Sequence, residues 1–164
     1  MTTPVVTTEP TEPDPIVPIT ATTADPHHPT VLFVCVRNGG KSQMAAALTR
    51  LHAGESLTVR SAGTDPGERL SAEAAASVEQ VGATFRGEYP KAITEGLLDG
   101  VDRIVVIGEA EIDPALLDGD DAPTVERWQT DEPSERGIEG QERLAIIRDD
   151  LDTRVRALVQ ELLV

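Results

Sequence analysis

The single cysteine of this chain, Cys35, stands between an apolar run and a segment that contains two glycines, a lysine and a serine. The apolar, β-branched residues 30–35 are typical of a buried strand. The strong helix formers at 43–48 favour a helix, which we expect Ser42 to cap. Cys35 would then face the backbone N–H groups of a loop and a helix N-terminus. Such a position binds tetrahedral oxyanions and favours the thiolate over the thiol.

A lone cysteine is also a common core residue with no chemical role. Here the adjoining pair Gly39 and Gly40, the cationic Lys41 and the neighbouring Ser42 favour a reactive cysteine in an anion-binding loop.

Composition limits the classes of partner. The 164-residue chain has a net charge of −15, which repels nucleic acid and anionic membranes. No apolar run approaches the roughly 18 residues of a membrane span, and the N-terminus lacks the regions of a signal peptide. One cysteine excludes an intramolecular disulfide and fits a reducing compartment. We therefore expect a cytoplasmic protein with neither nucleic acid nor membrane as partner.

The first 29 residues differ from the rest of the chain. They are rich in Pro and Thr and contain no Lys or Arg. We expect residues 1–29 to be a disordered tail and residues 30–164 to form one domain. The adjacent His27 and His28 lie beside prolines without a cysteine partner, and we expect no metal site there.

Strands and helices alternate after the tail. Strand patterns occupy residues 57–61, 101–107 and, more weakly, 124–128, and Ser71 is expected to cap a helix that runs to about residue 81. The last element is an amphipathic helix, whose apolar stripe is Leu144, Ile147, Leu151, Val155, Leu158 and Leu162. This alternation predicts an α/β fold, a parallel sheet with helices on both faces that binds ligands at the carboxyl ends of its strands.

Three motifs, in the same order along residues 30–164, resemble those of low-molecular-weight protein tyrosine phosphatases. Cys35 is followed by five residues, a cation and Ser42, and the string at 38–45 is closer to the arsenate reductases built on that fold. Residues 61–64 match the Ser-Ala-Gly-Thr turn of that group. Residues 128–133 are similar to the Trp-x-x-acid-acid-Pro segment that supplies its general acid.

The nearest resemblance is to the actinobacterial one-cysteine enzymes, the arsenate–mycothiol transferases. It implies a three-layer α/β fold and arsenate reduction for arsenical resistance, with mycothiol as co-substrate, mycoredoxin as partner and no bound cofactor. The extra cysteines of thioredoxin-linked members are missing, so an external thiol would have to complete the redox chemistry.

The resemblance also assigns roles to residues. Cys35 would be the nucleophile or the thiol that meets arsenic, Ser42 would donate a hydrogen bond to its sulfur, and Glu132, or its neighbour Asp131, would be the general acid. The implied oxyanion-binding residues are Val36, Arg37, Asn38, Gly39, Gly40 and Lys41. Lys41 stands where the family usually has Arg, and Glu132 where it usually has Asp. Arg37 either supplies the missing guanidinium or faces solvent.

Two other functions fit the same loop. One is a phosphatase acting on phosphotyrosine or a small phosphate ester through a Cys35-phosphate intermediate, although only 2% of the chain is aromatic and able to stack a substrate ring. The other is an oxyanion-binding module that has lost catalysis; the lysine at position 41, where the family usually has arginine, is the argument for it.

Overall fold

The computed structural model describes residues 28–164, which fold around one four-stranded sheet with all strands parallel in the order β2-β1-β3-β4. The strands are β1 Thr30–Cys35, β2 Thr58–Gly63, β3 Arg103–Ile107 and β4 Thr124–Trp128. The predicted tail lies, except for residues 28 and 29, outside the described residues.

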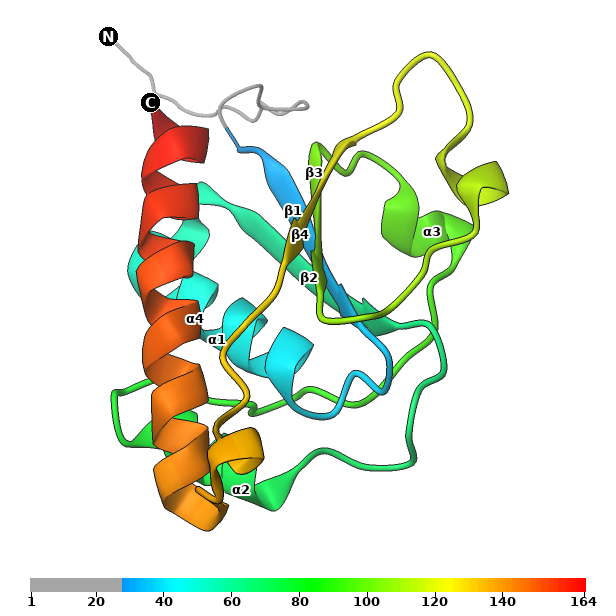
Figure 1. The fold of residues 1–164 in the computed structure, drawn as a ribbon. Helices are drawn as coiled ribbons and strands as arrows, with labels where there is room; N and C mark the ends of the chain where they lie inside the picture. Colours follow the sequence, from blue (N-terminus) through cyan, green and yellow to red (C-terminus); the bar gives the residue numbers. More distant parts are fainter. Residues whose placement is uncertain (1–27) are drawn as a thin grey trace, which may run out of the picture.

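Helices cover both faces of this sheet. The helices are α1 Lys41–Ala53, α2 Ala72–Glu79, α3 Glu95–Leu98 and α4 Gly140–Leu163, with short 3-10 turns η3 Gly54–Ser56, η4 Pro114–Leu117 and η5 Pro133–Arg136. Helices α1, α2 and α4 pack on one face, and α3 lies on the other (Figure 1). The predicted three-layer α/β fold is confirmed.

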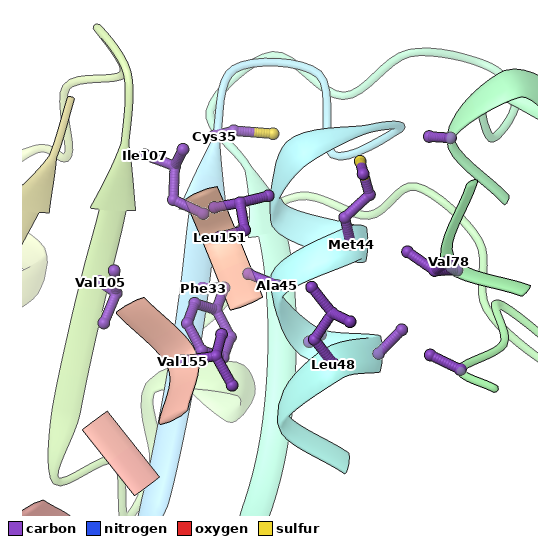
Figure 2. Close-up of a cluster of buried hydrophobic side chains, with 14 of the residues drawn as sticks. Phe33, Cys35, Met44, Ala45, Leu48, Val78, Val105, Ile107, Leu151 and Val155 are labelled. Carbon is purple, nitrogen blue, oxygen red and sulfur yellow. The ribbon is translucent and has the colours of Figure 1, made fainter. Parts of the chain in front are cut away.

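The alternation of side chains along the buried strand β1 divides the core in two. Val31 and Phe33 face α1 and α4, whereas Leu32 and Val34 face the α3 side. A strand covered on both faces reads as an unbroken apolar run, which is why this segment was predictable. Figure 2 shows Cys35 at the end of β1, at the edge of the larger cluster.

The predicted helices are present, but the start of α1 and the end of α2 differ from the prediction. The α4 stripe is buried from Leu144 to Leu158, and the Ser71 hydroxyl accepts a hydrogen bond from the Ala74 N–H at 3.1 Å. Helix α2 ends at Glu79, two residues earlier than expected. The expectation that Ser42 caps α1 is wrong.

The structure shows why Ser42 is not a cap. Helix α1 begins at Lys41 with Gly40 as its N-cap and no side-chain cap, so Ser42 is already a helical residue. The Ser42 side chain is fully buried, and its hydroxyl is engaged with the side chains of Cys35 and Asn38. The hydroxyl therefore serves the loop rather than the helix end.

Strand β2 extends to Gly63, two residues beyond the predicted strand, and ends against the loop that follows β1. A Cβ atom on Gly63 would lie 2.6 Å from the Val36 carbonyl oxygen and 3.1 Å from the Arg37 carbonyl carbon. Only glycine allows β2 and this loop to approach so closely. The Ser-Ala-Gly-Thr turn thus has a steric role in shaping the loop.

We predict that Gly63→Ala lowers the free energy of unfolding by about 2–4 kcal/mol, because the Val36 and Arg37 backbone atoms of the loop cannot easily move away from the new methyl group. Urea unfolding measures the change. Gly96→Ala is the matched control: it lies in α3 with the nearest atom 3.8 Å from its Cβ, and it should change stability by less than about 1 kcal/mol. Equal losses in the two variants would contradict the steric role of Gly63.

Candidate active site

Cys35 lies at the carboxyl end of β1, the strand at which the order of the parallel sheet reverses: β2 lies on one side of β1 and β3 on the other. Strands β2 and β3 flank β1 on its two sides, so a crevice opens beyond the carboxyl end of β1. A cavity of about 620 Å³ occupies this place. Its lining residues are Cys35, Val36, Lys41, Ile107, Gly108, Glu109, Gln129, Thr130, Asp131, Glu132 and Glu135. The topology therefore places the only thiol of the chain in a polar cavity.

Two donors surround the Cys35 sulfur. The Ser42 Oγ lies 2.9 Å from Sγ, and the Asn38 backbone N–H donates to Sγ at 3.2 Å. Only 9% of the Cys35 surface is exposed. A thiolate accepts hydrogen bonds and cannot donate one, so both groups stabilise the charged, nucleophilic form.

The Asn38 side chain braces the loop. Asn38 is fully buried and has a φ of 56°, the left-handed conformation that asparagine tolerates better than most residues. Its Oδ1 accepts from the Lys91 N–H at 3.0 Å and from Gln43 Nε2 at 3.2 Å, which directs its Nδ2 to Ser42 Oγ at 2.8 Å. The orientation of the Ser42 hydroxyl toward Cys35 thus depends on Asn38.

The remaining loop residues contribute in different ways. A Cβ on Gly39 would lie 3.1 Å from the Arg69 carbonyl oxygen, so this position also favours glycine. Arg37 forms a salt bridge with Asp65 at 3.1 Å, and 66% of its side chain is exposed. Arg37 is not among the residues that line the cavity, which favours the solvent-facing alternative.

Lys41 and Glu132 meet at the wall of the cavity. The Lys41 Nζ lies 3.4 Å from Glu132 Oε1. The Glu132 carboxylate also accepts two hydrogen bonds from Arg143 of α4, Nε to Oε2 at 2.8 Å and Nη2 to Oε1 at 3.0 Å. Ser134 donates from its hydroxyl to Oε2 at 2.7 Å. Both oxygens of Glu132 therefore have partners.

Arginine partners determine the charge of the two neighbouring acidic residues of the cavity, Glu132 and Asp131. The hydrogen bonds from Arg143 hold the pKa of Glu132 far below its usual range, against the opposing effect of burial and with help from Ser134 and Lys41. The paired hydrogen bonds from Arg136 likewise lower the pKa of Asp131. In this arrangement both carboxyls are ionised at neutral pH, so each accepts hydrogen bonds. The general-acid role of Glu132 stays a prediction.

The structure brings most of the predicted site residues together. Four of them line the cavity: Cys35, Val36, Lys41 and Glu132. The Ser42 hydroxyl, which is buried, lies within hydrogen-bond distance of the Cys35 sulfur. Sequence reasoning gave no role to Arg143, although it makes the strongest contacts with Glu132. The two residues lie eleven positions apart in different elements, and no local pattern joins them.

The described residues also bear on other site types. Every helix within residues 28–164 is too short or too polar to cross a bilayer. Over the same part of the chain, no three His, Cys, Asp or Glu side chains are grouped so that they could hold a metal ion.

Comparison with known proteins links this geometry to one family. Residues 30–163 match the family model described as "Low molecular weight phosphotyrosine protein phosphatase". A Halobacterium salinarum protein described as "Putative arsenate reductase" is 28% identical over 136 residues, which cover 79% of this chain and 89% of that protein.

Solved structures of two arsenate reductases are similar to this fold. The thioredoxin-dependent arsenate reductase of Corynebacterium glutamicum is 27% identical with a TM-score of 0.67; the match covers 85% of this chain and 64% of that one. The arsenate reductase of Archaeoglobus fulgidus is also 27% identical, with a TM-score of 0.63, and the match covers 79% of this chain and 98% of that one.

We predict that Ser42→Ala slows the alkylation of Cys35 by iodoacetamide at pH 7 about tenfold, because the thiolate loses a hydrogen bond from a fixed donor. The rate is measured by mass spectrometry, since Cys35 is the only thiol. Thr49→Ala is the control. It removes another buried hydroxyl of α1, one that donates its hydrogen bond to the Ala45 carbonyl and not to Cys35. An unchanged rate in Ser42→Ala would show that the hydroxyl does not stabilise the thiolate.

Proposed function

Because the chain belongs to the low molecular weight phosphotyrosine protein phosphatase family, we propose that it uses the family's oxyanion loop to reduce arsenate. Cys35 is the active thiol, and a small external thiol completes the reaction. Mycothiol is the proposed thiol, and a mycoredoxin regenerates it. The cellular role is detoxification of arsenate in the cytoplasm.

One observation carries this proposal: the only sulfur nucleophile of the chain lies at the base of the oxyanion loop. Backbone N–H groups of residues 36–41 and the Lys41 ammonium are suited to a tetrahedral anion. Arsenate is such an anion, and the curated and solved relatives at 27–28% identity are described as arsenate reductases.

A count of sulfur atoms supports the external thiol. Conversion of arsenate to arsenite takes two electrons, which two thiols supply as they form one disulfide, and the oxygen that arsenic loses leaves as one water molecule. In the first step a thiolate displaces this arsenic-bound oxygen, which takes up protons to leave as water. A second thiol then attacks the sulfur of the adduct and releases arsenite. This chain holds one thiol, so at least one must come from outside.

The phosphatase alternative fits the loop but is less well supported by the cavity. No aromatic residue lines the cavity within the described part of the chain, so a phosphotyrosine ring has no stacking partner there. Release of an aryl alcohol from a phosphate ester also needs a proton donor, whereas Glu132 is ionised and both of its oxygens are bonded. The oxygen that arsenic loses needs protons as well, so the missing stacking partner is the observation that separates the two functions.

We predict that arsenate turnover requires a small thiol and a redoxin. Arsenite should not form with thioredoxin, thioredoxin reductase and NADPH alone, and it should form steadily once mycothiol and mycoredoxin are added, because the chain lacks a second sulfur nucleophile. Cys35→Ser should reduce the rate at least about a hundredfold and leave the thermal unfolding curve in place. Arsenite release is measured directly, beside hydrolysis of an aryl phosphate.

The outcomes separate the alternatives. Many turnovers with thioredoxin alone would refute the external-thiol mechanism. Hydrolysis of the aryl phosphate without arsenite production in either system would establish the phosphatase instead. Binding of arsenate without either reaction would leave an oxyanion-binding module.

A further inference from the structure

Arg143 lies outside the oxyanion loop, yet its contacts reach the cation of that loop through Glu132. We infer that Arg143 is a positioning residue of the oxyanion site: it binds and neutralises the Glu132 carboxylate, so that Lys41 stays at the cavity wall and free to pair with an anion. This inference rests on oxyanion binding at the loop, as proposed above.

The first argument is the rigidity of the Arg143–Glu132 pair. The guanidinium binds the carboxylate through two parallel hydrogen bonds of 2.8 and 3.0 Å, the arrangement that fixes both groups most firmly. Arg143 lies in the first turn of α4, next to the buried Leu144. On the other side, Ser134 of η5 holds the same carboxylate with its hydroxyl at 2.7 Å. Glu132 is thus held in place by groups that do not belong to the loop.

The second argument is the looseness of the Lys41 contact. Its Nζ lies 3.4 Å from Glu132 Oε1, longer than either bond from Arg143, and the described residues offer it no other hydrogen bond or salt bridge. Lysine is a point charge on a flexible stem, so a nearby anion determines where its ammonium lies. Glu132 therefore keeps Lys41 beside the cavity, and an incoming oxyanion can take the ammonium while Glu132 keeps Arg143.

The third argument is the charge that would remain without Arg143. The side chains of Lys41, Glu132 and Arg143 are each only 28% exposed, so solvent screens them incompletely. Without the guanidinium, the Glu132 carboxylate would bind Lys41 closely and would add an uncompensated negative charge to the wall of an anion site. Both effects weaken oxyanion binding.

The test measures how inorganic phosphate and arsenate protect Cys35 from iodoacetamide, which gives an apparent Kd without turnover. We expect Arg143→Gln to raise this Kd about tenfold. The double variant Glu132→Gln/Arg143→Gln has the wild-type net charge and no carboxylate that binds Lys41 closely, so its Kd should recover most of this loss, to within about threefold of wild type. The remaining loss reflects the missing carboxylate that places Lys41 beside the cavity. Arg143→Lys keeps the positive charge, so its Kd should stay within about threefold of the wild-type value. This variant covers the case in which Arg143→Gln does not fold.

Arg136→Gln is the matched control. It removes the same charge from a residue that also makes a paired bond to a cavity carboxylate, Asp131. That pair is more exposed, with 52% of the Arg136 side chain accessible, and no contact joins Asp131 to Lys41 among the described residues. Its Kd should change by no more than about twofold, because solvent screens exposed charges.

The results distinguish the two levels of the proposal. An unchanged Kd in Arg143→Gln, or a double variant that binds as weakly as that single variant, would overturn the positioning role of Arg143 while oxyanion binding stands. If neither anion protects Cys35 in the wild-type protein, the oxyanion site itself is refuted and the role of Arg143 falls with it.

Discussion

The site depends first on the buried amide of Asn38. Its left-handed backbone turns the chain back over the end of β1, and its side chain joins the loop to α1 and to the Lys91 backbone. A buried amide in this place must satisfy its hydrogen bonds, and each bond that it makes fixes one more part of the loop. The Ser42 hydroxyl, the Asn38 N–H and the Cys35 sulfur occupy their positions as a consequence.

The two residues that the sequence resemblance marks as unusual, Lys41 and Glu132, are in contact with each other. Lys41 and Glu132 are ninety-one positions apart, and their side chains meet at the cavity. A lysine lacks the rigid fork of an arginine and needs a neighbour to place it, and the longer glutamate can lie between α1 and α4. In this structure the two side chains therefore position each other at the wall of the cavity.

Local patterns were sufficient to predict some features of this molecule and insufficient for others. The buried strand β1, the apolar stripe of α4 and the glycine-containing loop each follow from residues close together in the sequence. The short helix α3 has four residues and too little periodicity to be recognised. Arg143 is one of several α4 arginines that bind acidic side chains, as Arg154 and Arg156 also do. Only the folded chain reveals which of them binds Glu132, a residue of the cavity wall.

The packing of α4 on α1 also determines when the site can exist during synthesis. The loop and its cysteine are made early, but the guanidinium that balances Glu132 belongs to the last helix of the described fold. Until α4 has been made, the apolar face of α1 lacks its cover and Glu132 lacks the guanidinium that balances its charge. Anion affinity should therefore arise late, together with closure of the core, and a nascent chain should carry its thiol before it can hold a substrate.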